Sequence, residues 1–356
     1  MTTDFPGGNG IVSYLPDGAV LLDRDKRDSV GDRWYWSVRM RSDRSGVVRV
    51  GLARPGILGR FGPWVRRGTR EAWLSTTPIP DGSFDLPIEP GEVVEVSAAA
   101  PYGPKQLRRF IGKTRQASGV SWTDLTKSED GRPVPLAVAN HHARPTRTVL
   151  LTARHHACEG AGSFVLEGAV ARFLEMRREG RGEALTTELI AAPIVDIDGV
   201  WRGDPGKARR PWDHNRDYQS RSRYRAVAAL RTLIGSTHRP LFALDLHTPG
   251  LRGVLEERPY IVASGHEQDT RQARDLVTEA EAVDAQLLVF DEEWNDPAST
   301  GQRCCAAWLR SLRRTRLALT IEYPNAVDRG TPVTPECARR FGAVMIQGLT
   351  TLAARL

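Results

Sequence analysis

Residues 149–168 read VLLTARHHACEGAGSFVLEG and place a polar cluster between two regular patterns. Residues 149–152 form a short apolar run, which is typical of a buried strand in a parallel sheet. Residues 162–178 carry apolar side chains at helical spacing. A strand that leads into a helix predicts an α/β unit, with the polar cluster at the turn between them.

The rest of this half of the chain continues the α/β pattern. Residues 241–246 and 317–323 are apolar runs that predict two further buried strands, and residues 338–352 predict a closing helix. Residues 267–296 are acid-rich and predict a surface element that is helical over 273–285. His141 and His142 follow another short apolar run and are interpreted as loop residues.

The first hundred residues have a different character. Trp34, Trp36, Val38 and Met40 alternate with more polar residues, and this period of two predicts a half-buried strand. Two similar runs lie at residues 47–52 and 92–96, and turn-rich pieces lie between them at 54–56 and 80–82. Short strands with frequent turns predict a small β-sandwich.

The change of pattern places a domain boundary near residue 105. Residues 101–104 read PYGP, and residues 105–113 predict a short helix. We therefore expect a β-sandwich domain over 1–105 and a second domain over 106–356. The 356 residues, 40% of them apolar, suffice for two cores.

Composition also bears on the compartment. No apolar stretch approaches the length of a transmembrane helix, and residues 1–10, MTTDFPGGNG, lack the features of a signal peptide. None of the four cysteines forms a C-x-x-C pair, which argues against a zinc ribbon and fits a reducing compartment. We expect a cytoplasmic protein that does not bind membranes.

The formal net charge is +7, with 50 Lys and Arg residues. The simplest interpretation is a compositional habit, and the functional alternative is a positive field that steers acidic substrates. The basic residues are scattered and no known nucleic-acid-binding motif is present. We therefore expect no nucleic-acid partner.

Candidate catalytic residues follow three predicted strands. His155, His156 and Glu159 follow the first, His247 follows the second, and Glu322 lies at the end of the third. Ligands of open α/β sheets bind beyond the carboxyl ends of the strands, so these side chains are expected to converge.

Two histidines and one glutamate form a known ligand set of catalytic zinc. His156 and Glu159 are three positions apart, so a helical turn or tight loop can direct both at one ion, and His247 would be the third ligand. Glu322 then remains as a general base for a water whose pKa the metal lowers. Each motif alone arises often by chance, and the combination carries the prediction.

These residues also carry a resemblance to a known family. The segment ARHHACE at 153–159, followed by SFVLEG, resembles the first zinc motif of the zinc metallocarboxypeptidases, the family of the pancreatic carboxypeptidases. Four further segments resemble the family's motifs in the same order: DIDGV at 196–200, DHNRDY at 213–218, LDLH at 244–247 and TIEY at 320–323. The match covers residues 130–356. Trp34–Val38 and Pro101–Tyr102 more weakly resemble the β-domain of the cytosolic, bacterial-type branch.

The resemblance implies a mixed-sheet catalytic domain of the α/β class, preceded by the β-sandwich. It implies one zinc ion held by His156, Glu159 and His247, with Glu322 as the general base. Asn215 and Arg216 would hold the terminal carboxylate of the substrate, a task that suits an Arg fork and an amide donor. His155 falls on a variable position of the motif and is interpreted as a neighbour in the pocket or a structural residue.

The chain departs from the family at two points. The position of the Arg that polarises the scissile carbonyl falls on Gly206 in an ungapped comparison. Lys207, Arg209 or Arg210 could supply the charge instead, and we favour Lys207. The family often has a Tyr in the loop before the catalytic Glu, but no Tyr lies between Tyr260 and Tyr323.

The favoured function is therefore a zinc-dependent metallocarboxypeptidase, a hydrolase that removes C-terminal residues from peptides or protein tails, with acidic tails among the implied substrates. Two alternatives remain. The same zinc core serves deacylases of N-acyl amino acids, although the β-domain before the catalytic part argues against that branch. An inactive peptide-binding protein of the same fold is the other, and the presence of all three ligands and Glu322 disfavours it.

Overall fold

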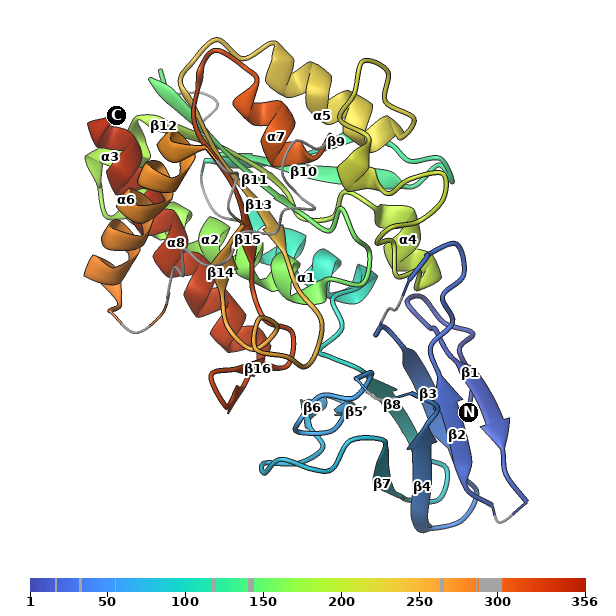
Figure 1. Cartoon of the computed structure of the whole chain (residues 1–356). Helices are drawn as coiled ribbons and strands as arrows, with labels where there is room; N and C mark the ends of the chain where they lie inside the picture. Colours follow the sequence, from blue (N-terminus) through green and yellow to red (C-terminus); the bar gives the residue numbers. More distant parts are fainter. Residues whose placement is uncertain are drawn as a thin grey trace.

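The computed structural model describes residues 1–16, 18–31, 34–54, 56–116, 119–139, 144–262, 266–285, 287 and 303–356. His141, His142 and most of the acid-rich stretch after residue 287 lie outside these ranges. Figure 1 shows a β-rich N-terminal part beside a larger part in which helices flank a central sheet.

The N-terminal part consists of two four-stranded sheets. The first, in the order β1-β2-β4-β7, contains β1 (Ile11–Tyr14), β2 (Val20–Asp23), β4 (Gly46–Leu52) and β7 (Ser83–Ile88). The second, in the order β3-β8-β5-β6, contains β3 (Ser37–Arg41), β8 (Val93–Ser97), β5 (Trp64–Arg67) and β6 (Arg70–Trp73).

A shared apolar core joins these two sheets. Trp36 is fully buried, and its ring stacks on Phe84 of β7 with the ring centroids 6.2 Å apart. Trp36, Val38 and Met40 are buried, as the alternation predicts, but Ser37 is buried too and Trp34 is only half-buried. The strand itself begins only at Ser37, so that prediction was too long at its start.

The larger part is built on a seven-stranded mixed sheet, as expected for the α/β class. Four neighbouring strands are parallel, an antiparallel strand flanks them on each side, and a last strand pairs antiparallel with one of these flanking strands. In order across the sheet the strands are β14 (Tyr260–Ile261), β15 (Thr315–Glu322), β13 (Leu241–His247), β11 (Arg147–Ala153), β12 (Thr187–Ala192), β10 (Pro133–Ala139) and β9 (Val120–Lys127). Every residue of β13 is buried, which explains its continuous apolar run.

Helices cover both faces of this sheet. In Figure 1, α2, α6 and α8 lie on one face, and α5 and α7 lie on the other. The helices are α1 (Pro104–Arg115), α2 (Gly160–Arg178), α3 (Gly182–Leu185), α4 (Ile197–Arg202), α5 (Arg225–Gly235), α6 (Glu267–Val283), α7 (Cys305–Arg310) and α8 (Pro335–Arg355), with a 3-10 turn η1 (His214–Arg216) and a small hairpin of β16 (Val327–Asp328) and β17 (Thr331–Pro332). None of the helices in the described ranges is both long and apolar enough to cross a membrane.

Two glycines let α2 and α8 pack in direct backbone contact. A Cβ atom at Gly168 would lie 1.9 Å from the carbonyl oxygen of Arg339, and one at Gly342 would lie 1.8 Å from that of Val165. No other residue type fits at either position. This contact fixes the helix that begins directly after Glu159.

The β-sandwich also supports two loops of the larger part. Leu251 follows β13 and Ala326 follows β15, and both side chains belong to the sandwich core. Arg252 donates from Nε to the carbonyl oxygen of Leu58 at 2.5 Å, and Trp73 donates from Nε1 to that of Val333 at 2.7 Å. Because the sandwich core takes in residues beyond 105, the division of the chain at that residue stays a prediction.

Candidate metal centre

The three predicted site strands end at one edge of the central sheet. β11, β13 and β15 are parallel neighbours, so the residues after their carboxyl ends lie together. The register pairs His247, the last residue of β13, with Glu322, the last residue of β15. His156 and Glu159 lie in the turn between β11 and α2.

His156, Glu159 and His247 form a compact buried group whose ligand atoms lie within 4.8 Å of one another. The Nδ1 atom of His156 lies 2.8 Å from Glu159 Oε1, and the Nδ1 atom of His247 lies 2.7 Å from Glu159 Oε2. The two Nδ1 atoms are 3.2 Å apart. Two imidazole nitrogens and a carboxylate thus face one small volume.

The turn that carries these residues has an unusual backbone. Arg154 has a positive φ of 62°, which redirects the chain as it leaves β11. Glu159 is the residue before the first turn of α2, and its carboxylate points back toward His156 and His247. The predicted spacing of three is therefore met by a tight turn at the helix start rather than by a helical turn.

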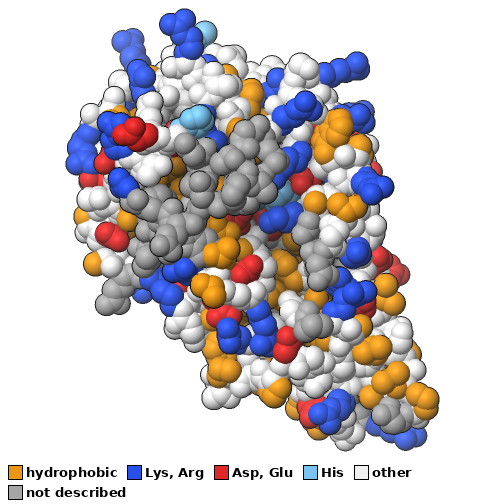
Figure 2. All heavy atoms as spheres, in the orientation of Figure 1, with side chains coloured by type: hydrophobic (Ala, Val, Ile, Leu, Met, Phe, Trp, Pro, Cys, Tyr) orange, Lys and Arg blue, Asp and Glu red, His pale blue; other side chains and the backbone are white. Residues whose placement is uncertain are grey.

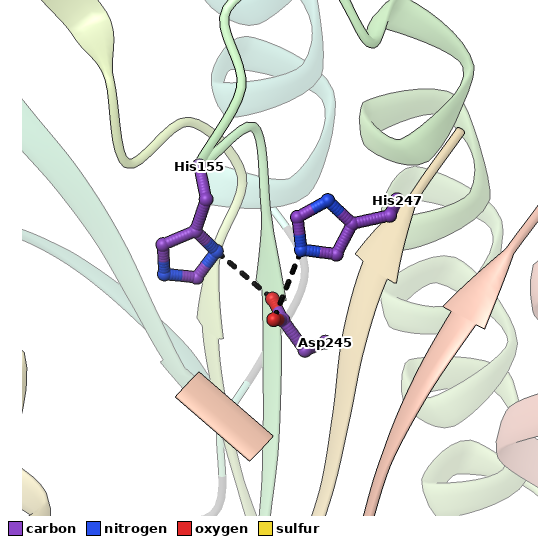
Figure 3. Close-up of side chains that lie close together, drawn as sticks. All are labelled: His155, Asp245 and His247. Atoms are coloured by element: carbon purple, nitrogen blue, oxygen red, sulfur yellow. Dashed lines mark hydrogen bonds and ion pairs between the residues drawn. The ribbon is translucent and has the colours of Figure 1, made fainter. Parts of the chain in front are cut away.

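Asp245 contacts the imidazole nitrogen of His247 that faces away from Glu159. Its Oδ2 atom lies 3.0 Å from His247 Nε2, and its Oδ1 atom lies 2.9 Å from Nδ1 of His155 and accepts a hydrogen bond from Thr152 at 2.8 Å. Figure 3 shows the carboxylate of Asp245 between the two imidazoles. His155 also lies 2.7 Å, through Nε2, from the hydroxyl of Tyr218. His155 is therefore fully buried beside the site and does not belong to the His156 group.

Asp213 lies beside Nε2 of His156, as Asp245 lies beside Nε2 of His247. Its Oδ2 atom lies 3.4 Å from His156 Nε2 and accepts a hydrogen bond from the backbone N–H of Ala208 at 2.8 Å. Both histidines thus turn Nε2 toward a buried aspartate and Nδ1 toward Glu159. A carboxylate behind each imidazole fixes its orientation and strengthens the other nitrogen as a ligand.

The electrostatics of the group suit a cation. Burial alone would raise the pKa of Glu159, but the neighbouring His156, Lys207 and His247 lower it well below its usual range, so the carboxylate is charged. Burial alone would lower the pKa of His247, but Asp245 and Glu159 raise it well above its usual range. The two carboxylates thus favour positive charge at His247. A divalent ion would displace any proton from the ligand nitrogen, as metal binding at histidine requires.

Glu322 lies beside this group and has no role in the ligand set. It is 9% exposed, and Oε2 has no hydrogen-bond partner among the described residues. Burial raises its pKa, and the charge of Lys207 opposes that shift. A carboxylate with a raised pKa and a free lone pair is suited to accept a proton near neutral pH.

Lys207 is the one of the three candidate cations that reaches the group. Its Nζ atom lies 3.1 Å from Glu159 Oε1. Arg209 is buried and pairs instead with Asp28, Asp196 and Asp204 at 3.1–3.3 Å. Arg210 is exposed. Gly206 has a positive φ of 75°, and a Cβ there would lie 2.5 Å from the backbone nitrogen of Ala157, so no side chain fits at that position.

Asn215 and Arg216 lie in η1, next to the group. Asn215 is buried, and its Oδ1 accepts a hydrogen bond from the backbone N–H of Cys305 at 2.8 Å. Its Nδ2 lies 3.0 Å from His247 Nε2, an atom that also faces the carboxylate of Asp245. The amide nitrogen carries two N–H groups, so at least one of them remains for a substrate. Arg216 is half-buried and donates one hydrogen bond to the carbonyl oxygen of Asn215.

Sequence reasoning left Asp213, Asp245 and Tyr218 without a role. The two aspartates were present in the DHNRDY and LDLH segments, so a signal existed. Their role depends on which way each imidazole turns, which only the three-dimensional arrangement shows. The contact of Tyr218 with His155 joins residues 63 positions apart and leaves no local pattern.

Comparison with known proteins identifies the fold of the chain. The chain matches neither the models of known protein families nor the curated protein sequences. Among solved structures it resembles a metallo-carboxypeptidase from Pseudomonas aeruginosa in complex with (2-guanidinoethylmercapto)succinic acid, with a TM-score of 0.83 and 18% identity over 99% of this chain and 98% of that one.

It also resembles a metallo-carboxypeptidase from Burkholderia cenocepacia, with a TM-score of 0.80 and 17% identity over 99% and 98% of the two chains. The chain has the metallocarboxypeptidase fold. The carboxypeptidase A of Helicoverpa armigera matches with a TM-score of 0.52 and 13% identity over 72% of this chain and 73% of that one. The bacterial enzymes are thus similar over nearly the whole length, the β-sandwich included.

Proposed function

We propose that the protein is a zinc-dependent metallocarboxypeptidase that hydrolyses the C-terminal peptide bond of peptides or protein tails. One observation carries the proposal: the His156–Glu159–His247 group and Glu322, whose Oε2 has no hydrogen-bond partner among the described residues, meet at the end of the sheet where β13 and β15 finish. The fold supports the same assignment. The deacylase and binding-protein alternatives gain no observation of their own.

One zinc ion would be held by Nδ1 of His156, Nδ1 of His247 and the carboxylate of Glu159. Nitrogen and carboxylate oxygen are donors that zinc accepts, and three protein ligands leave a position open. When bound, the ion supplies Lewis acidity, which polarises a carbonyl oxygen and lowers the pKa of water. Asp213 and Asp245 keep both imidazoles turned toward it.

Glu322 is the proposed general base. Its Oε2 atom, which has no described partner, would take a proton from the attacking water and return it to the leaving amine. Burial among charged groups keeps bulk water away from this oxygen. The raised pKa lets one carboxyl serve both as base and as acid.

Asn215 and Arg216 are the proposed partners of the substrate's terminal carboxylate. The N–H that Asn215 has to offer and the guanidinium of Arg216 would give a directed, charge-assisted contact. The succinic acid compound bound to the Pseudomonas enzyme carries carboxylates, which fits recognition of this kind. Requiring a free carboxylate restricts cleavage to the last peptide bond.

Lys207 is the proposed replacement for a carbonyl-polarising Arg. Its ammonium lies next to Glu159 and within the field of Glu322, where it would stabilise charge that develops on the scissile carbonyl oxygen. Burial would lower the pKa of Lys207, but Glu159 and Glu322 raise it above its usual value, so the group stays cationic.

The test is mass spectrometry of a defined peptide mixture incubated with the zinc-loaded protein. Each peptide is supplied with a free and with an amidated C-terminus, and each reaction is repeated with a chelator. We expect loss of single C-terminal residues from the free-ended peptides alone, stopped by the chelator. Intact peptides in every reaction, with zinc content verified, would refute the proposal, and release of acyl groups from N-acyl amino acids would favour a deacylase.

A further inference from the structure

A second cavity lies outside the candidate metal centre, where the β-sandwich meets the larger part. It has a volume of about 220 Å³. Its lining residues come from β3, β5 and β8, from the start of α1, from α4 and from the turn before α2. None of the proposed zinc ligands, and neither Glu322 nor Lys207, lines it. It is therefore a separate site.

Arg154 lies in the wall of this cavity and is only 3% exposed. It donates from Nε to the carbonyl oxygen of Ala157 at 2.9 Å and from Nη1 to that of Tyr102 at 2.8 Å. In the described ranges, no carboxylate oxygen lies within ion-pair distance of its guanidinium. A buried cation is costly unless negative charge compensates it. All three guanidinium nitrogens bond to backbone carbonyls, which supply only partial charge, and Glu159 acts on Arg154 only from beyond ion-pair distance.

The rest of the lining increases this excess of positive charge. Glu95 is the one acidic residue among the lining residues, and it is shared by Arg39, at 3.1 Å, and Arg66. Two more cations, Lys105 and Arg108, project from the start of α1. The first turn of α1 has no acidic residue, so the positive end of a 12-residue helix adds to the field.

Aromatic residues contribute much of the remaining lining, beside small and apolar residues. Trp34, Tyr35, Tyr102 and Trp201 all line the cavity. The hydroxyl of Tyr35 is used in a hydrogen bond to the carbonyl oxygen of Gly7 at 2.7 Å, so Tyr35 offers its ring and not a donor. A volume of this size suits a small molecule.

We propose that this cavity binds a small organic carboxylate with a flat apolar body. The carboxylate would compensate Arg154 and the rim cations Lys105 and Arg108, and the body would pack on the aromatic walls. Arg154 holds the carbonyl of Ala157, which lies between His156 and Glu159 in the chain. Arg154 therefore connects the cavity to the turn that carries two proposed zinc ligands.

Isothermal titration calorimetry of the full, zinc-loaded chain tests this proposal with benzoate as the probe. Benzamide has the same ring without the charge, and inorganic phosphate has the charge without the ring. We expect benzoate to bind at a site that Arg216→Gln leaves intact, more tightly than phosphate, and benzamide to give no measurable heat. Binding should weaken as salt is added, because an ion pair forms.

Variants locate the probe. Arg154→Gln is the direct change, but it removes buried hydrogen bonds and could unfold the protein. The double variant Lys105→Gln/Arg108→Gln removes two exposed charges instead, and we expect it to weaken benzoate binding about tenfold. The matched control is Arg216→Gln, which alters the proposed substrate site and should leave benzoate binding unchanged.

Several results would overturn the proposal. These are absence of benzoate binding, equal binding of benzamide, tighter binding of phosphate than of benzoate, or binding that the Lys105/Arg108 variant leaves intact. Loss of benzoate binding in Arg216→Gln would place the probe at the metal centre and would equally refute it. None of these outcomes depends on peptidase activity, so this test and that of the proposed function can fail separately.

Discussion

His247 and Glu322 are registered neighbours on the parallel strands β13 and β15, and each is the last residue of its strand. The sheet therefore sets the distance between a proposed zinc ligand and the proposed base. Loops do not have to fold correctly for the two to meet. Because one residue is proposed to bind zinc and the other only to accept a proton, we expect mutations to separate the two functions.

Glu322→Gln should abolish hydrolysis while zinc stays bound. The amide keeps the size of the side chain but cannot accept the proton from water, and loss of a general base costs about 10²–10⁴-fold in rate. Peptide turnover and zinc content by atomic absorption are measured on the same preparation. His247→Gln, which changes the strand partner, should lose the metal as well. Turnover that survives Glu322→Gln would show that another group acts as the base.

Asp245→Asn should weaken zinc binding while leaving all three proposed ligands in place. Asp245 faces Nε2 of His247, and loss of such a carboxylate typically costs about 10–100-fold in metal affinity. Competition with a chromophoric chelator measures the affinity without any need for activity. Asp328→Asn, at a half-buried aspartate that pairs with Arg329, is the matched control. Equal zinc affinity in both variants would leave Asp245 with a purely structural role.

The overall fold could be predicted from the sequence because the patterns that indicate it are local. The apolar runs predicted β11, β13 and β15 to within two residues at either end, since strands buried on both faces must be apolar throughout. The position of the proposed ligands at strand ends followed from the same logic. The start of β3 was missed because Trp36 is buried by stacking on Phe84, which looks like strand alternation in the sequence.

The supporting residues of the site were less accessible. Asp245 and His155 are 90 positions apart, and only the pairing of β11 with β13 brings them together. The basic cavity was not predicted at all. Its cations come from β3, β5, α1 and the turn after β11, so no stretch of sequence shows a basic cluster. Figure 2 likewise shows Lys and Arg side chains spread over the visible face of the molecule.

Lys207→Met should lower kcat far more than it changes KM. If the ammonium stabilises charge that develops on the scissile carbonyl, its loss affects the transition state and costs about 10²–10³-fold in kcat. Lys207→Arg keeps the charge and should retain a substantial part of the rate. Steady-state kinetics on one free-ended peptide compare the three proteins. A raised KM with an unchanged kcat in Lys207→Met would instead assign Lys207 to substrate binding.

We expect the folded protein to lose stability in mild acid because of His214. It is buried, its ring stacks on Tyr224 with the centroids 3.7 Å apart, and burial lowers its pKa to about 4, although Asp196 opposes the shift. Because the pKa is lower in the folded state, the unfolded chain binds the proton first, and stability falls as pH drops from about 6.5 toward 4. The contribution is about 3 kcal/mol at most.

Denaturant unfolding of His214→Phe across this range should show a shallower pH dependence than the wild type, and the same substitution at exposed His238 controls for loss of an imidazole as such. Parallel curves for His214→Phe and the wild type would mean that the buried imidazole does not set the acid sensitivity of the fold.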